Sequence, residues 1–293
     1  MEETNKVFCW IDNRKIKKEV IVNITIFTPT YNRAYCLEQL YKSLCIQTSS
    51  DFEWVIVDDC SSDNTESLVR GWIEEKKISI TYFLQPQNGG KHRAINKGVE
   101  LSKGELFFIV DSDDFLTDDA VESIQAEWNM LQDKKSYAGI CFRRMTKSLN
   151  MLGDDFPSYR CSGTSIDIAY KWKCVADKAE VFKTEILRKY PFPDIKGENF
   201  CQEAIIWFKI ARDKNGVLLC INKGIYVCEY LPDGLTANIG EKMKNNPRYN
   251  FLWQITLLSI PYEWKWPNIK NIVKTACWMI YRIYFRRFFK NDT

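Results

Sequence analysis

The chain has 293 residues, of which 45% are hydrophobic and 27% are charged, so it can bury a sizeable core and is neither a disordered tail nor a coiled coil. Its 11 cysteines include no C-x-x-C pair, which argues against a zinc knuckle or a disulfide framework and favours reduced thiols. We expect a cytoplasmic protein, because residues 1–20 lack an apolar signal segment and no stretch is long enough to cross a bilayer.

The first 115 residues alternate between apolar runs and segments with helical spacing. Strands are predicted at residues 20–27, 52–57, 78–83 and 106–110, and helices at residues 34–47, 65–76 and 94–101. This alternation predicts a parallel, doubly wound sheet with right-handed crossovers.

A polar cluster follows each of the four predicted strands. The clusters are residues 28–33, 58–64, 88–91 and 111–114. Ligands of such sheets bind at the carboxyl ends of the strands, so the four clusters together predict one binding site.

The last of these clusters, Asp111-Ser112-Asp113-Asp114, brings three carboxylates to the edge of the sheet. Like charges this close repel one another unless a cation or hydrogen-bond donors neutralise them, and Mg²⁺ or Mn²⁺ prefers oxygen ligands. The alternative is a loop in which one Asp caps the next helix and the others are solvated.

Residues 88–91 form a second candidate for phosphate binding. No G-x-G-x-x-G follows the first strand and no G-x-x-x-x-G-K-[ST] occurs. The sequence therefore argues against a nicotinamide enzyme and against a P-loop protein. Backbone amides at the start of the helix could approach a phosphate, with Lys91 as a point charge; the alternative is an ordinary tight turn. The one histidine, His92, excludes a Ser-His-Asp triad and is expected to pack or hydrogen-bond locally.

The second half is less regular. We predict helices at residues 118–131 and 203–212 and strands at residues 138–143 and 217–220. Periodicity alone does not define their topology.

Four motifs taken in order, TPTYNR, VDDCSSDNT, NGGKHRAINKG and VDSDD, resemble those of the inverting family 2 glycosyltransferases with the GT-A fold. The resemblance covers roughly residues 22–235. It implies an α/β, GT-A-like Rossmann-type sandwich with a mainly parallel central sheet. The domain boundaries that we expect are an N-terminal extension (1–20), a glycosyltransferase domain (21–235, with a nucleotide-sugar half at 21–115 and an acceptor half at 116–235) and a C-terminal helical region (236–293).

The resemblance also implies roles for individual residues. Asp59 would hydrogen-bond the uracil, and Tyr31 would stack on the base. Asp111 would reach the ribose. Asp113 would hold Mn²⁺ or Mg²⁺ on the diphosphate, and Asp111 and Asp114 are further candidate ligands of the metal. The remaining expected contacts of the nucleotide sugar are Thr28, Arg33, Asn88, Gly90, Lys91 and Ser112.

The catalytic base of the family begins a helix in the second half, where Glu203 is our candidate. This chain has Gln-Glu where many relatives have Glu-Asp, so a neighbouring residue or Glu198 is the alternative. An acidic residue at a helix start also has a plain explanation in the helix dipole. Residues 230–236 resemble a lid over bound donor, and an ordinary turn is the competing interpretation.

The resemblance implies metal-dependent, inverting transfer of a hexosyl or N-acetylhexosaminyl group from a nucleotide sugar, which we expect to be a UDP-sugar. The expected acceptor is a saccharide or a polyprenyl-linked saccharide in cell-surface polysaccharide synthesis. The alternatives are a nucleotidyltransferase, although its glycine- and arginine-rich N-terminal signature is missing, and a non-catalytic scaffold that binds nucleotide or polysaccharide.

The C-terminal region is basic and aromatic, with seven Lys/Arg and no acidic residue in residues 264–291. Ile269, Ile272, Val273 and Ala276 fall on one side of a helix and the lysines on the other, which favours docking on the anionic inner face of the cell membrane over nucleic-acid binding. The alternative is a helix docked on the body with a solvated basic face.

Overall fold

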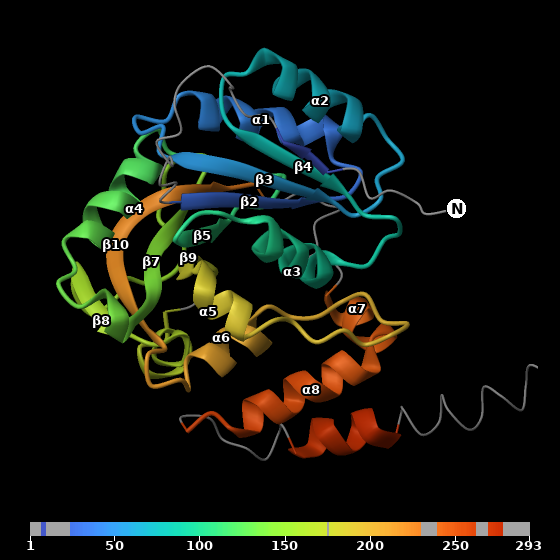
Figure 1. The fold of residues 1–293 in the computed structure, drawn as a ribbon. Coiled ribbons are helices and arrows are strands. Elements are labelled where there is room, and N and C mark those ends of the chain that lie inside the picture. Colours follow the sequence, from blue (N-terminus) through green and yellow to red (C-terminus); the bar gives the residue numbers. More distant parts are fainter. Residues whose placement is uncertain (1–6, 10–23, 175, 230–238, 262–268, 278–293) are drawn as a thin grey trace, which may run out of the picture.

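The computed structural model describes residues 7–9, 24–174, 176–229, 239–261 and 269–277. One ten-stranded sheet, in the order β1-β4-β3-β2-β5-β9-β7-β10-β6 with β8 paired to β10, runs through the fold (Figure 1). The strands are β1 (Val7–Cys9), β2 (Ile24–Thr30), β3 (Phe52–Asp58), β4 (Ile80–Leu84), β5 (Leu106–Ile109), β6 (Phe115–Leu116), β7 (Tyr137–Thr146), β8 (Arg160–Gly163), β9 (Lys178–Lys183) and β10 (Val217–Cys228).

The N-terminal half has the predicted parallel arrangement. Strand β2 pairs in parallel with β3 on one side and with β5 on the other, and β3 pairs in parallel with β4. The chain therefore winds outward from β2 in one direction and then in the other, which creates a topological switch point between β2 and β5. Strand β2 extends to Thr30, beyond its predicted end at residue 27, and residues 20–23 lie outside the described part of the chain.

Helices cover both faces of the sheet (Figure 1). Helices α1, α2 and α3 follow the parallel strands β2, β3 and β4, α4 follows the short strand β6, and α8 packs on α6 and α7. The helices are α1 (Ala34–Cys45), α2 (Thr65–Glu75), α3 (Lys91–Leu101), α4 (Ala120–Asn129), α5 (Thr184–Lys189), α6 (Ala204–Ile210), α7 (Ile239–Asn245) and α8 (Pro247–Leu258), with a π-helical turn η2 (Asp167–Lys171).

Each face of the sheet has its own core. On the face of α1 and α2, Tyr41 stacks on Trp72 with ring centroids 4.4 Å apart, and Trp54 is fully buried beside them. On the face of α3, a Cβ added to Gly98 would lie 2.1 Å from the Phe27 ring, so only glycine lets this helix approach β2 so closely. This close packing fixes the start of α3 relative to the ends of the parallel strands.

The second half differs more from the predictions. Strand β9 pairs antiparallel with both β5 and β7, and neither β8 nor β9 was predicted. The strand predicted at residues 217–220 continues as β10 to Cys228 and pairs with β7, β8 and β6. Because β10 crosses from one strand partner to another, its two-residue side-chain alternation is interrupted by register shifts, and the periodicity breaks after residue 220.

No helix among the described residues is both long enough and apolar enough to span a bilayer. Residues 269–277 are helical. The predicted lid at residues 230–236 and the rest of the predicted basic tail, at residues 264–268 and 278–291, lie outside the described residues. The described cysteine side chains are free thiols, as expected.

Candidate active site

A cavity of about 870 Å³ opens at the carboxyl ends of the parallel strands. It lies at the switch point, where side chains that follow β2, β3 and β5 meet the starts of α3 and α6. The predicted site residues that line it are Tyr31, Arg33, Asp59, Asn88, Gly90, Lys91, Asp111, Ser112, Asp113, Asp114 and Glu203.

Thr28 is the one predicted site residue that the structure does not bring to this cavity. Since β2 continues to Thr30, Thr28 lies inside the strand, fully buried, and its Oγ1 accepts a hydrogen bond of 2.9 Å from Trp54 Nε1. Thr30, at the actual end of the strand, lines the cavity in its place.

The two adjacent aspartates after β3 have different roles. Asp58 is fully buried and accepts hydrogen bonds from the Tyr82 hydroxyl and the Ser61 amide, both at 2.7 Å. Asp59 lines the cavity and accepts from the amides of Gly89 and Gly90, also at 2.7 Å. Burial raises the pKa of both carboxyls, and the two glycine amides partly oppose this effect at Asp59. Asp59 also accepts a hydrogen bond of 2.7 Å from Gln85 Nε2, so it fixes the glycine turn at the wall of the cavity.

The glycine turn also touches the second half of the chain. Gly90 has a φ of 91°, and a Cβ added there would lie 1.9 Å from the carbonyl oxygen of Asn199. Only glycine fits both this backbone conformation and this contact. The turn then leads directly into Lys91, the first residue of α3.

Lys91 is the central cation of the site. Its Nζ lies 2.5 Å from Asp111 Oδ1 and 2.7 Å from Glu203 Oε1, and all three side chains are mostly buried. Burial opposes the charge of Lys91, but the two carboxylates outweigh it and raise its pKa. In the same way, burial would raise the pKa of Asp111, but Lys91 and Arg144 hold it below its usual range.

The carboxylate of Asp114 is hydrogen-bonded by residues of β10 and of the segment that follows it. Its Oδ2 accepts from the Tyr226 hydroxyl and its Oδ1 from the Glu229 amide, both at 2.7 Å, and the same hydroxyl accepts from the Asp111 amide at 2.9 Å. Burial and the nearby Asp111 raise the pKa of Asp114 to about 7. Asp114 thus shapes the acidic loop, with both of its oxygens already engaged.

Asp113 is the carboxylate that best fits a cation. Among the described residues it has no hydrogen-bond partner outside its own backbone, and burial together with Asp111 raises its pKa. No group of three His, Cys, Asp or Glu in the described chain could hold a metal unaided. The donor set therefore fits Mg²⁺ or Mn²⁺ that takes most of its oxygen ligands from a bound diphosphate and water.

The two candidate bases are clearly separated in space. Glu203 immediately precedes α6 and lines the cavity. Glu198 is buried away from the cavity lining, where its carboxylate accepts hydrogen bonds of 3.0 Å from the amides of Arg248 and Tyr249 at the start of α8. Glu203 also stands at a helix start, but its side chain makes no capping hydrogen bond there and pairs with Lys91.

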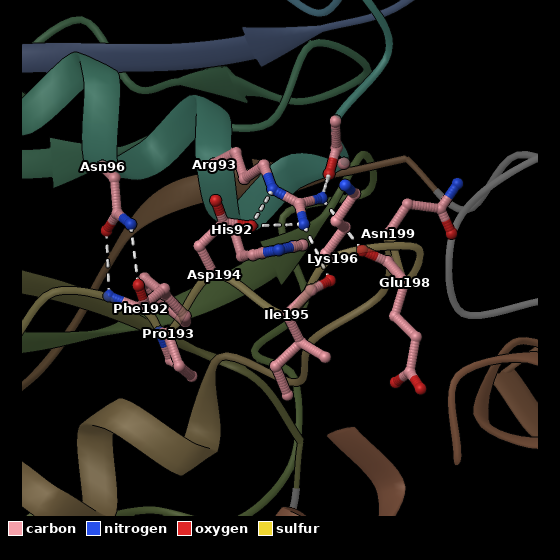
Figure 2. A network of polar contacts seen from close by, with 12 residues as sticks. His92, Arg93, Asn96, Phe192, Pro193, Asp194, Ile195, Lys196, Glu198 and Asn199 are labelled. Atoms are coloured by element: carbon pink, nitrogen blue, oxygen red, sulfur yellow. Dashed lines mark hydrogen bonds and ion pairs between the residues drawn. The ribbon is translucent and has the colours of Figure 1, made fainter. Parts of the chain in front are cut away.

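Figure 2 shows how the segment before Glu203 is fastened to α3. Arg93 donates to the carbonyl groups of Glu198 and Ile195 at 2.9 and 3.0 Å and to the Asp194 carboxylate at 2.8 Å. Asn96 exchanges two hydrogen bonds with the backbone of Phe192. These contacts make α3 the common support of the glycine turn and the loop that leads to α6.

His92 contributes to the same support. It is buried, and its Nε2 lies 2.8 Å from the Tyr249 hydroxyl, which donates to the Pro193 carbonyl at 2.6 Å. Burial lowers the pKa of His92 to about 4. Its role as a packing and hydrogen-bonding residue was expected from the sequence.

Three residues near the site were not identified from the sequence. Arg144 on β7 stacks over the Tyr226 ring at 4.0 Å, and Glu180 on β9 lines the cavity. Tyr226 and Arg144 carry no local signal. For Glu180, the only indication in the sequence of a role in the site was its position as a charged residue between the apolar Ala179 and Val181.

Comparisons with known proteins agree with this architecture. The family model described as "Glycosyl transferase family 2" matches residues 25–188. A GalNAc(5)-diNAcBac-PP-undecaprenol beta-1,3-glucosyltransferase of Campylobacter jejuni is 27% identical over 201 residues, 66% of this chain and 60% of that protein. The poly(ribitol-phosphate) beta-N-acetylglucosaminyltransferase TarS of Staphylococcus aureus is 29% identical over 108 residues, 36% of this chain and 19% of its own length. The chain therefore spans less than two thirds of either relative.

Two solved structures share the fold. TarS 1–349 of S. aureus in complex with UDP-GlcNAc has a TM-score of 0.60 at 18% identity, covering 89% of this chain and 73% of that one. The mannosyltransferase PcManGT of Pyrobaculum calidifontis in complex with GDP-Man and Mn²⁺ has a TM-score of 0.57 at 18% identity, covering 89% and 75%.

The parallel sheet and the carboxylates at its switch point define the class as an α/β protein with the GT-A fold. Since the family model matches more than half of the residues, the chain belongs to glycosyl transferase family 2.

Proposed function

We propose that the protein is a metal-dependent, inverting glycosyltransferase that moves a hexosyl or N-acetylhexosaminyl group from a UDP-sugar to a saccharide or lipid-linked saccharide in cell-surface polysaccharide synthesis. The observation that carries this proposal is the meeting of Asp59, Lys91, Asp113 and Glu203 around one cavity at the switch point. The named activities of the relatives, one on an undecaprenol-linked saccharide, support the same class of reaction.

At the donor end, Asp59 would accept a hydrogen bond from the uracil, and Tyr31, which is 47% exposed, would stack on the base. Lys91 and the start of α3 would meet the diphosphate. Asp113 would hold Mg²⁺ or Mn²⁺, which when bound offsets the negative charge of the departing nucleoside diphosphate.

Beside the donor, at the start of α6, Glu203 would remove the proton of the acceptor hydroxyl. A carboxylate on the face opposite the leaving group suits a single displacement, which inverts the anomeric carbon. For this role the ion pair between Glu203 and Lys91 must weaken. The diphosphate would do this by replacing Glu203 as a partner of the Lys91 ammonium group.

The C-terminal region would hold the protein at the membrane, where a lipid-linked acceptor lies. Ile269 and Val273 on the helix at residues 269–277 are 41% and 57% exposed. Their exposure, together with the lysines of this helix, supports docking on an anionic bilayer.

The test is a panel of nucleotide sugars with Mn²⁺, Mg²⁺ or EDTA, in which thermal stabilisation and release of nucleoside diphosphate are measured. We expect one UDP-sugar to stabilise the protein and to release UDP only with metal. Asp113→Asn should abolish the effect of metal, whereas Asp51→Asn, at an exposed position outside the cavity, should not. Release of pyrophosphate would instead indicate a nucleotidyltransferase, and indifference to every nucleotide sugar would indicate a scaffold.

A further inference from the structure

The cavity extends beyond the residues assigned to the donor. Its other walls come from η2, β9 and α6 and include Ile168, Ala169, Phe208, Asp177 and Glu180. Apolar walls with a few polar groups are typical of a site for an organic ligand. None of these residues has a role in the donor site described above.

Glu180 is a polar group of this part of the cavity whose carboxyl group no other described residue binds. It lies on β9, between β5, which leads to Asp111, and β7, which carries Arg144. Its neighbours Ala179 and Val181 are fully buried. Apart from a hydrogen bond with its own backbone, no hydrogen bond or ion pair from another described residue holds its carboxyl group, although a partly buried carboxyl normally has one.

The nearby cations are directed elsewhere. Lys178 Nζ donates to the carbonyl groups of Cys174 and Ala176 at 3.3 and 2.9 Å. Arg144 Nε donates to the Lys178 carbonyl at 2.8 Å, and its guanidinium group covers the Tyr226 ring. Neither of these two described cations forms an ion pair with Glu180, so their charges act on it only from a distance.

Three charged residues from separate parts of the chain act on Glu180: Arg144, Asp177 and Glu203. Burial raises its pKa to about 7, Arg144 on β7 opposes this rise, and Asp177 and Glu203 add to it. Near neutral pH the carboxyl group can therefore both donate and accept hydrogen bonds, which suits a hydroxyl group. A second anion in the same place would meet Asp177, Glu180 and Glu203 together.

We infer that Glu180 binds a hydroxyl group of the acceptor saccharide and selects against acceptors that carry a carboxylate at that point. This inference rests on the proposed glycosyl transfer, in which the acceptor occupies the part of the cavity beside Glu203. Glu180 is thereby a specificity-determining residue, distinct from the proposed base.

The experiment compares two probes that differ in one group, methyl β-D-glucopyranoside and methyl β-D-glucopyranosiduronate. Their binding to the full chain in the presence of UDP is measured by saturation-transfer NMR and calorimetry. We expect the wild type to prefer the neutral glycoside by about tenfold, because like charges repel in a poorly solvated site. Glu180→Gln should reduce this preference to about threefold, because Asp177 and Glu203 remain, and Glu180→Asp should preserve it.

Glu185→Gln is the matched control, since this glutamate is 72% exposed on α5 and lies outside the cavity lining; it should keep the wild-type preference. Equal affinity of the wild type for both probes, no binding of the neutral glycoside, or an unchanged preference in Glu180→Gln would overturn the inference. UDP affinity and UDP-sugar hydrolysis, which should persist in Glu180→Gln, report separately on the proposed function.

Discussion

Lys91 Nζ lies 2.7 Å from Glu203 Oε1, so the cation expected to meet the diphosphate is bound to the carboxylate expected to act as base. The same ammonium group also binds Asp111. A single side chain on α3 thus connects the donor end of the cavity with the start of α6.

Lys91→Met should lower both stability and UDP affinity. Removing the cation leaves Asp111 and Glu203 as uncompensated, mostly buried charges, and we expect the free energy of unfolding to fall by about 1–3 kcal/mol. Denaturant unfolding and calorimetry with UDP measure the two effects. Lys42→Met, which removes a lysine that is 69% exposed from a surface ion pair, should change neither. Wild-type stability in Lys91→Met would show that the Lys91 contacts contribute little.

Glu203→Gln should stop turnover without preventing donor binding. General base catalysis typically contributes about 10²–10⁴-fold, so we expect a loss of kcat in this range with UDP affinity largely retained. Glu198→Gln is the comparison, because it weakens the contacts at the start of α8 and should lower thermal stability more than kcat. If Glu203→Gln kept full activity and Glu198→Gln lost it, the assignment of the base would be wrong.

The stability of the protein should depend on pH through Glu180. Its pKa rises from 4.5 in the unfolded chain to about 7 in the fold, so between these values the folded state binds more protons. The stabilising effect of this protonation is complete below pH 4.5 and is lost as the pH rises through 7. Glu180→Gln lacks this titration, so relative to wild type it should gain about 1–3 kcal/mol of unfolding free energy from pH 5 to pH 8.

Urea unfolding at a series of pH values measures the difference in unfolding free energy between Glu180→Gln and wild type. The contributions of the other titrating groups are the same in both proteins and cancel in this difference. Glu185→Gln should run parallel to wild type at every pH. A constant difference between Glu180→Gln and wild type would mean that the carboxyl group titrates alike in the folded and unfolded states.

The helix at residues 269–277 should contribute to binding of anionic vesicles. Each lysine near an anionic surface is worth about 1 kcal/mol, so Lys270→Ser with Lys274→Ser should lower the affinity for phosphatidylglycerol vesicles by more than tenfold. Cosedimentation at low and high salt measures this effect. Replacement of the exposed Lys42 and Lys77 instead should leave binding unchanged. Equal binding to neutral vesicles would contradict the electrostatic part of the proposal.

The first half of the fold could be predicted because each of its strands and helices is a local pattern. The parallel strands are rich in apolar residues, the helices between them are amphipathic, and polar residues follow each strand end. The residues that line the cavity at the ends of the parallel strands could therefore be predicted from the sequence, apart from Thr28, whose place depended on where β2 ends.

The second half depends on contacts between distant residues. The hydroxyl group of Tyr226 reaches Asp114 across 112 positions of the sequence, and Glu180 faces the cavity because β9 inserts between β5 and β7. Neither relationship leaves a periodic pattern. The ion pairs of Lys91 likewise became apparent only when α3 and α6 were placed together.

The contact between Gly90 and the carbonyl group of Asn199 has a kinetic consequence. No side chain lies between the two backbones, and an added Cβ would overlap the carbonyl oxygen. A nucleotide sugar that shifts the glycine turn must therefore also displace the segment that leads to Glu203. In the proposed transfer we therefore expect bound donor to reshape the part of the cavity beside Glu203, so the two substrates should add in compulsory order, with the donor first.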